Sequence, residues 1–549
     1  MFSGEISGAI AVSGGTEEFD ILCADAPVWR AAHSNTDRMN LTRSITTITH
    51  RGQEMIANGT SSIVTGTILN FIGGAYRSGS AGKTFANINP ATGQEIGTVH
   101  EASEADVADA VAAAKAALNG PWGKMAVTER VRLITAVADE IDRRADDFLA
   151  AEVADTGKPR HVASHIDIPR GAANFRMFTD VISTMPTESF TIATPDGSQA
   201  LNYVVRKPKG VIAVICPWNF PFLLMTWKVG PALACGNTLV VKPSEETPRT
   251  AALLGEVMNE VGVPEGVYNV VHGFGAGSAG EFLTTNDDID AITFTGETGT
   301  GQAIMQKAAV GVRDISFELG GKNPAIVFAD VDLDKAIEGL SRSVFLNTGQ
   351  VCLGTERVYV ERPVFEEFVK RMTAAARAFN PGAIGDPAYL GPLISAEHQE
   401  KVLRYYARAV AEGATVVTGG GVPAIAGDGA GGFYVEPTLW TGLAHDSTVM
   451  REEIFGPCCG VIPFDTEDEV IRLANDTDYG LCATVWTENL SRAHRVAALM
   501  QVGVCWVNCW FLRDLRTAFG GSGQSGIGRE GGVHSLEFYT ETENICVKF

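Results

Sequence analysis

The sequence lacks most of the patterns that identify membrane-bound, secreted or nucleic-acid-binding proteins. No run of about 18 apolar residues occurs, so we expect no transmembrane helix. Basic residues are too few for a nucleic-acid or anionic-membrane surface, because 43 Lys and Arg stand against 65 Asp and Glu, a net charge of −22. The N-terminus has no basic segment followed by an apolar one, as a secretory signal would have. We therefore expect no nucleic acid and no membrane among the partners.

The sequence also lacks the spacings of a metal site or a disulfide framework. Its ten cysteines contain no C-x-x-C pair, which excludes a zinc ribbon and a thioredoxin-type motif. His161 and His165 are spaced to share a helix face, yet no Glu occupies the H-E-x-x-H position and no third ligand is evident. We expect no bound metal, and the reduced thiols of a cytoplasmic protein.

The composition that is present is that of an ordinary globular protein. The chain has 549 residues, of which 45% are apolar and 20% charged, enough for three or four domain-sized units. Residues 1–66 are rich in Ser, Thr and Gly with little periodicity, and we predict a disordered N-terminal extension there.

Short apolar runs alternate with helical segments from Gly210 onward, which predicts α/β architecture. Such runs predict strands of a parallel sheet that is covered on both faces. A second alternation extends from about Val331 to Val507, and helix caps are predicted at Ser103 and Thr466. The predicted strands are Val211–Ile215, Thr238–Val241, Tyr268–Val271, Ala291–Phe294 and Ala325–Phe328.

Two glycine clusters could each receive a phosphate group. Gly275–Gly280 matches G-x-G-x-x-G, and Gly296–Gly301 also follows a predicted strand; the spacing does not choose between them. Glu245 follows the strand that ends near Lys242, where an acid can bind a ribose diol and repel a 2′-phosphate. This favours NAD over NADP, although a solvated Glu in a turn remains an alternative.

Three further segments carry residues suited to nucleophilic catalysis. Cys352 lies in a glycine-flanked loop, although most cysteines are merely small buried hydrophobes. Glu318 stands among apolar residues at a strand end, where burial should raise its pKa toward that of a general base. Asn219 lies in a turn bounded by prolines. The order Asn, Glu, Cys in these settings is more specific than any one of them.

Together the motifs resemble the aldehyde dehydrogenase superfamily, from about Ile68 to Phe549. The resemblance implies a Rossmann-type NAD domain, an α/β catalytic domain and a small β oligomerisation element, hence a homodimer or homotetramer. The segments that carry it are Pro217-Trp-Asn-Phe-Pro221, Lys242-Pro-Ser-Glu245, Phe294-Thr-Gly296, Glu318-Leu-Gly-Gly321, Gly349-Gln-Val-Cys352 and Glu453-Ile-Phe-Gly-Pro457.

The resemblance also implies a role for each site residue. Cys352 would be the nucleophile, Asn219 the oxyanion donor and Glu318 the base that hydrolyses the thioester, while the start of a helix after Cys352 would help to ionise the thiol. The phosphate loop would be the one after Phe294-Thr-Gly296. Lys242 and Glu245 would bind the adenosine ribose of NAD, Glu453 the nicotinamide ribose, and Phe455 would pack near the nicotinamide. The other implied NAD-binding residues are Pro217, Trp218, Gly296 and Glu297.

The C-terminal segment narrows the implied substrate to an anionic semialdehyde. Val507–Arg516 and Gly532–Tyr539 resemble the subgroup that oxidises muconic semialdehydes, with a 2-hydroxy or 2-amino substituent left open. Arg170 and Arg513 match the arginines of that subgroup, and a guanidinium fork suits a substrate carboxylate. Three alternatives remain open. The arginines could form ordinary surface salt bridges, the substrate could be a betaine or aliphatic aldehyde, or the protein could bind NAD without catalysis.

The resemblance implies the following domain boundaries: 67–186 and 209–319 for the NAD-binding domain, 320–520 for the catalytic domain, and 187–208 with 530–549 for the oligomerisation element.

Overall fold

The computed structural model of the chain describes residues 65–549. The predicted N-terminal extension lies outside the described residues, apart from its last two positions, and the first strand, β1, already begins at Gly66. Within 65–549, no helix is both long and apolar enough to cross a membrane.

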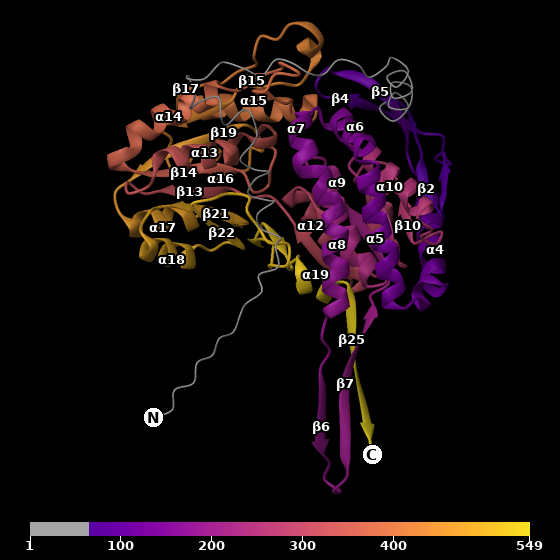
Figure 1. Cartoon of the computed structure of the whole chain (residues 1–549). Coiled ribbons are helices and arrows are strands. Elements are labelled where there is room, and N and C mark those ends of the chain that lie inside the picture. Colours follow the sequence, from indigo (N-terminus) through magenta and orange to yellow (C-terminus); the bar gives the residue numbers. More distant parts are fainter. Residues whose placement is uncertain (1–64) are drawn as a thin grey trace, which may run out of the picture. The chain divides into compact units, whose positions relative to one another are not determined.

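An eight-stranded sheet forms the first half of the fold (Figure 1). Its five central strands are parallel, and β8, β9, β10 and β11 are buried throughout, which confirms the first four predicted strands. In spatial order the strands are β24 (Gly526–Ile527), β12 (Asp314–Glu318), β11 (Ala291–Thr295), β8 (Val211–Ile215), β9 (Thr238–Lys242), β10 (Tyr268–Val270), β2 (Asn70–Ile72) and β3 (Ala75–Arg77).

Helices cover both faces of this sheet, as its continuous apolar strands require. One apolar core joins it to α5 (Val127–Arg143), α6 (Ala145–Thr156), α8 (Ile168–Thr184), α9 (Pro221–Ala234), α10 (Arg249–Glu260) and α19 (Gly532–Phe538). A second core joins the opposite face to α4 (Glu104–Asn119), α11 (Ala279–Thr285) and α12 (Thr298–Ala308). After β8 the chain places β9 on one side and β11 on the other, so the strand order reverses at the carboxyl end of β8. Ligands bind at such reversals.

A seven-stranded sheet forms the second alternation. In spatial order its strands are β17 (Thr415–Thr418), β18 (Thr438–Thr441), β19 (Cys458–Phe464), β14 (Thr355–Glu361), β13 (Asn323–Val327), β21 (Cys482–Trp486) and β22 (Val504–Val507). Only the β17–β18 pair is antiparallel. Its helices are α13 (Leu333–Phe345), α14 (Phe365–Arg377), α15 (Ala396–Ala411), α16 (Thr448–Arg451), α17 (Glu467–Asn475) and α18 (Leu490–Leu499). The predicted strand at 325–328 is β13.

Three long antiparallel strands form a separate small sheet, here called the arm (Figure 1). It consists of β6 (Ser189–Ala193), β7 (Gln199–Pro208) and β25 (Thr540–Lys548). The strand β25 pairs with β7 along its whole length, from Thr540 opposite Pro208 to Lys548 opposite Ala200. All five residues of β6 are exposed.

The remaining elements are short. They are β1 (Gly66–Ile68), β4 (Thr84–Asn89), β5 (Gln94–His100), α7 (Arg160–Val162), β15 (Asn380–Pro381), β16 (Tyr389–Leu390), β20 (Tyr479–Gly480) and β23 (Ser522–Gly523).

Both predicted helix caps are present, with one difference. Ser103 and Asp106 form a reciprocal capping box at the start of α4. Thr466 caps α17 by accepting from the amide of Glu469, but the Glu469 carboxylate accepts from the Asp465 amide rather than from that of Thr466.

Candidate active site

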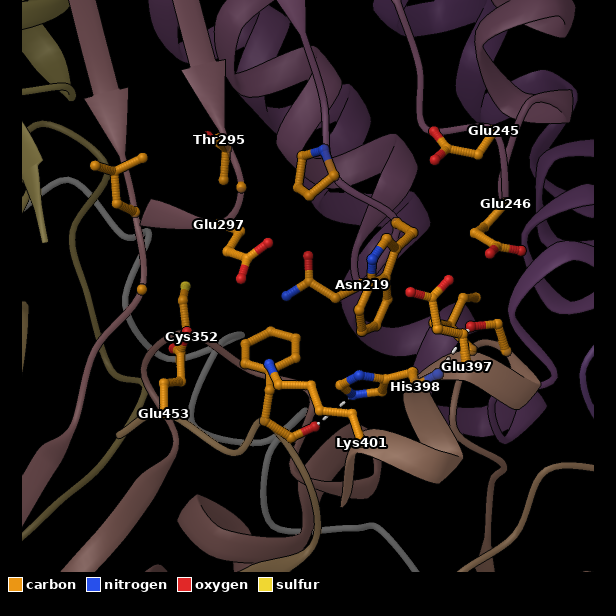
Figure 2. Close-up of a pocket in the computed structure, with 18 of the residues that line it drawn as sticks. Asn219, Glu245, Glu246, Thr295, Glu297, Cys352, Glu397, His398, Lys401 and Glu453 are labelled. Carbon is orange, nitrogen blue, oxygen red and sulfur yellow. Dashed lines mark hydrogen bonds between the residues drawn. The ribbon is translucent and has the colours of Figure 1, made fainter. Parts of the chain in front are cut away.

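A cavity of about 420 Å³ lies where the carboxyl ends of β8, β11 and β12 face α15 (Figure 2). Its walls include every predicted site residue except Lys242, Arg170 and Arg513. Those that line it are Pro217, Trp218, Asn219, Glu245, Gly296, Glu297, Glu318, Cys352, Glu453 and Phe455. Cys352, Glu297 and Glu453 lie at one end of the cavity, and Glu245, Glu246 and Glu397 lie at the other.

Asn219 is held in the turn between β8 and α9 by contacts from three directions. Its Nδ2 donates to the carbonyl of Gln350 at 3.0 Å. Its backbone carbonyl accepts from Lys158 Nζ at 3.0 Å and from Asn347 Nδ2 at 2.9 Å. The amide side chain therefore has a fixed orientation, and its second N–H is available to a group in the cavity.

Cys352 lies in a loop between a 3-10 turn at Leu346–Gly349 and β14. The expectation that a helix begins after Cys352 is wrong, because the chain enters the seven-stranded sheet at Thr355 instead. Burial, together with the charges of Glu318 and Glu453, raises the pKa of the thiol to about 12. The amides of Leu353 and Cys352 act in the opposite direction. Without ligands the thiol is therefore protonated at neutral pH.

Glu318 ends strand β12 and is buried, as predicted. Burial, and next the charge of Glu530, raise the pKa of its carboxyl well above the usual range, while Lys228 and Arg513 act to lower it. Its Oε1 accepts no hydrogen bond from any described residue. A buried carboxyl with a raised pKa and a free oxygen is suited to accept a proton near neutral pH.

Glu453 is fixed against the segment that follows Glu318. Its Oε1 accepts from the amide of Gly321 at 2.8 Å, and a Cβ added at Gly320 would collide with its Oε2. Burial and the charge of Glu356 raise the pKa of Glu453 to about 7.

Acidic side chains line the far end of the cavity. Lys242 is buried behind them, and its Nζ donates to the Pro243 carbonyl at 2.8 Å and to Glu245 at 3.5 Å. Burial, with the charges of Glu245 and Glu397, raises the pKa of Glu246 to about 7. This end could accept hydrogen bonds from a diol and would repel a phosphate.

The two glycine clusters differ in their relation to the cavity. Gly296 and Glu297 line it and lead into α12, whereas no residue of 275–280 lines it. The Glu297 side chain makes no capping hydrogen bond to the first turn of α12, and a Cβ added at Gly299 would meet nothing within 4 Å. The first amides of α12 are thus open to an anion such as a pyrophosphate.

Arg170 and Arg513 lie over the same aromatic ring outside the cavity wall, and both are partly buried. Their guanidinium carbons lie 5.7 and 4.5 Å from the ring centre of Trp227, and that of Arg513 lies 4.1 Å from the ring centre of Phe519. Burial and the neighbouring charge of Arg513 lower the pKa of Arg170 to about 9, and burial lowers that of Arg513 to about 10.

Neither arginine forms a salt bridge with a described residue; Arg170 Nε donates to Asn174 Oδ1 at 3.1 Å, and Arg513 Nε has no partner among them. The alternative of surface salt bridges does not match this geometry. Two partly buried cations that form no salt bridge with a described residue have a geometry that could hold an anion.

No sequence pattern indicates that α15 contributes to the cavity. His398 lies edge-on to the Trp218 ring at 5.2 Å, and its Nε2 donates to the Phe455 carbonyl at 2.8 Å. Burial lowers the pKa of His398 to about 4, so the ring is neutral. Ser395 could have been identified as a helix cap, but no local pattern tells which face of a helix meets a distant sheet. The missed residues are Glu246, Thr295, Leu319, Gly320, Ile394, Ser395, Glu397, His398, Lys401 and Arg404.

Comparison with known proteins gives consistent matches. The model of the aldehyde dehydrogenase family matches residues 76–545. A 2-hydroxymuconic semialdehyde dehydrogenase of Pseudomonas sp. (strain CF600) is 67% identical over 88% of this chain and 99% of its own. A 2-aminomuconic 6-semialdehyde dehydrogenase of Pseudomonas sp. is 56% identical over 87% and 97%. The NAD+ complex of an aldehyde dehydrogenase from Bacillus cereus superposes with a TM-score of 0.84 at 39% identity, covering 88% of this chain and 97% of that one. The chain belongs to the aldehyde dehydrogenase family.

Proposed function

We propose that this protein oxidises 2-hydroxymuconic semialdehyde to 2-hydroxymuconate with NAD, in the breakdown of aromatic rings by meta cleavage. The observation that carries the proposal is one arrangement of residues. Asn219, Glu318 and Cys352 line one cavity. The charge of Arg513, which lies near that of Arg170, interacts with both Glu318 and Cys352. The relative that is 67% identical bears the name of this activity.

NAD fits the residues of the cavity. The uncapped amides of α12 suit a pyrophosphate, and the carboxylates of Glu245 and Glu453 suit its two riboses. Lys242 lies directly behind Glu245, and the rings of Phe455 and Trp218 stand edge to face at 5.4 Å. When bound, NAD supplies the hydride acceptor.

The side chains of this protein supply the rest of the chemistry. The Cys352 thiol loses its proton to solvent water, and the thiolate adds to the aldehyde carbon to give a thiohemiacetal, whose oxyanion accepts hydrogen bonds from Asn219 Nδ2 and the Cys352 amide. In other enzymes each such donor contributes about 3 kcal/mol. Loss of hydride leaves a thioester on Cys352. Glu318 then takes a proton from water, the hydroxide attacks the thioester carbonyl, and the acid leaves as the thiol is regenerated.

The arginine pair supports an anionic substrate. Muconic semialdehydes carry a carboxylate at the end opposite the aldehyde, and two guanidinium groups can bind it with bidentate hydrogen bonds. A cation such as betaine aldehyde would be repelled by the same two charges. Oxidation of 2-aminomuconic semialdehyde is the second candidate, because a relative of that name is 56% identical and the arginines would serve either substrate equally.

The proposal is tested by following NADH absorbance with 2-hydroxymuconic semialdehyde, 2-aminomuconic semialdehyde, betaine aldehyde and an aliphatic aldehyde. We expect rapid turnover of the first, and loss of at least about 10³-fold in Cys352→Ala, whose methyl group cannot form the thioester. Preference for betaine aldehyde would contradict the substrate. Turnover retained by Cys352→Ala would contradict the mechanism.

We also propose how the molecule is organised. Residues 67–186 and 209–319 would bind NAD, residues 320–520 would carry the nucleophile, and residues 187–208 with 530–549, which include the arm, would join subunits into a homodimer or homotetramer. Phe190 and Ile192 of β6 are 62% and 52% exposed, which supports a protein partner at the arm. The cysteines of the described residues all have free thiols, which supports a cytoplasmic location.

A further inference from the structure

The loop that carries Glu453 and Phe455 has a strained backbone. Phe455 has a φ of 62°, in the left-handed region that residues other than glycine rarely adopt. Such a conformation persists only where surrounding contacts fix it, and it tends to occur at functional sites. Because Phe455 and Glu453 both line the cavity, whatever holds this loop also sets the shape of the site.

One buried carboxylate, that of Glu356, holds the backbone of this loop. Its Oε1 accepts from the amide of Phe455 at 2.8 Å and from that of Ile454 at 3.1 Å, and its Oε2 also lies 3.1 Å from the Ile454 nitrogen. Glu356 does not line the cavity and is almost fully buried. Its side chain therefore acts on the loop from behind.

The position of Glu356 results from a β-bulge. In the pairing of β13 with β14, Asn323 lies opposite Thr355 and Pro324 lies opposite Arg357, so Glu356 is the extra residue between them. The ladder to β19 begins only at Arg357. A bulge in a parallel pair is uncommon, and bulges beside active sites redirect a side chain. Here the side chain of the extra residue, Glu356, reaches the 453–455 loop.

A second set of contacts ties Glu356 to the segment after the predicted base, Glu318. Lys322 Nζ forms an ion pair with Glu356, and both side chains are buried. The Lys322 carbonyl accepts from Arg357 Nε at 2.8 Å, and the neighbouring Gly321 amide donates to Glu453 Oε1. Two contacts thus link the segment around Gly321 and Lys322 to the 453–455 loop. The Lys322 ammonium pairs with Glu356, which accepts from the amides of the loop, and the Glu453 carboxylate accepts from the Gly321 amide.

We infer that Glu356, paired with Lys322, is a positioning residue that fixes the 453–455 loop in the conformation that binds the nicotinamide end of NAD. The inference rests on the proposed use of NAD. Glu356 touches neither cofactor nor substrate; it acts through the backbone of Ile454 and Phe455. His398 supports the same loop from the cavity side, through the Phe455 carbonyl (Figure 2).

The test compares NAD affinity with a reaction of Cys352 that needs no NAD. NAD is titrated calorimetrically into the wild type, Glu356→Ala and Glu356→Gln, and hydrolysis of p-nitrophenyl acetate is measured without NAD. We expect Glu356→Ala to raise the Kd for NAD about tenfold or more. This fold-change should be at least about five times larger than the fold-loss in the rate of ester hydrolysis. Glu356→Gln should lie between, because its amide oxygen still accepts one N–H.

Arg144→Met is the matched control. Like Glu356, Arg144 has a largely buried side chain in an ion-pair network, here with Glu256, Glu260 and Asp147, but it lies between α5 and α6 and does not line the cavity. Its loss should lower Tm without changing the Kd for NAD. The inference is overturned if NAD affinity in both Glu356 variants stays within twofold of the wild type, or falls no more than ester hydrolysis. It is equally overturned if Arg144→Met weakens NAD binding as much at equal loss of Tm. If Glu356→Ala does not fold, Glu356→Gln decides. A wild type that binds no NAD would instead contradict the proposed function.

Discussion

At the scale of single residues, the raised pKa of Glu318 predicts a pH dependence. A general base works only when ionised, so kcat should rise with pH through the pKa of this carboxyl, which burial places well above the usual range of a glutamate. Glu318→Gln should remove this rise and lower kcat by about 10²-fold or more, since an amide cannot take a proton from water. The first NADH at each active site should still form rapidly, because the thioester forms from Cys352, Asn219 and bound NAD, with the thiol proton released to solvent.

Stopped-flow absorbance separates the two steps for Glu318→Gln. A burst of one NADH per site followed by slow turnover is the expected trace. Loss of the burst together with turnover would show that Glu318 acts before the thioester forms.

The arginine pair predicts opposite effects on stability and activity. Arg170 is a partly buried cation whose pKa is lowered by desolvation and by Arg513, so its charge destabilises the folded protein. Arg170→Met should raise the KM for the anionic semialdehyde by about 100-fold. It should also stabilise the ligand-free protein by about 0.5–2 kcal/mol, seen as a higher Tm.

Arg176→Met is the control for this prediction, because Arg176 stands on the same helix, α8, but is 40% exposed in its side chain and paired with Asp139 and Asp142. Arg176→Met should leave the KM for the semialdehyde unchanged and should not raise the Tm. A lower Tm in Arg170→Met with an unchanged KM would mean that Arg170 is a structural residue.

At the scale of elements, local pattern predicted what local physics determines. Continuous apolar runs such as Val211–Ile215 are buried strands, and Ser103 with Asp106 caps a helix, because strand burial and capping depend on residues close in sequence. The loop after Cys352 was predicted wrongly as a helix start. Whether such a loop enters a helix or a sheet depends on β13 and β19, which come from distant parts of the chain.

Most of the predicted site residues line one cavity. Asn219, Gly296 and Glu318 do so because they follow or end strands whose carboxyl ends meet, which a motif order can indicate, whereas Cys352 and Glu453 come from loops that precede β14 and β19. The residues of α15 were missed for the opposite reason. His398 and Lys401 reach the cavity only because α15 packs against the far side of it, and nothing within α15 records that contact. Glu356 also escaped prediction, since a bulge is a property of two strands and not of one.

At the scale of the whole molecule, the arm predicts how subunits associate. Phe190 and Ile192 are two residues apart on β6 and therefore share one face of the strand. Replacing both with Asp should convert the proposed oligomer to monomers, because charge on an apolar contact must be desolvated to re-form it. Size-exclusion chromatography with light scattering gives the mass directly.

Thr191→Asp adds a single negative charge to the opposite face of β6, which is also exposed, and should leave the mass unchanged. An unaltered mass in the double variant would mean that this face of the arm does not join subunits.

The pairing of β25 with β7 has a consequence for synthesis on the ribosome. β7 emerges about 330 residues before its partner, which at 5–20 residues per second is a delay of roughly 20–70 s. Throughout this interval β6 is the only strand of the arm available to β7, so the opposite edge of β7, which β25 later covers, stays open. An open edge of this kind is a template for pairing with another nascent chain. Neighbouring ribosomes on one messenger hold such chains close together, so the same edge that completes the arm is also a place where nascent chains can associate prematurely.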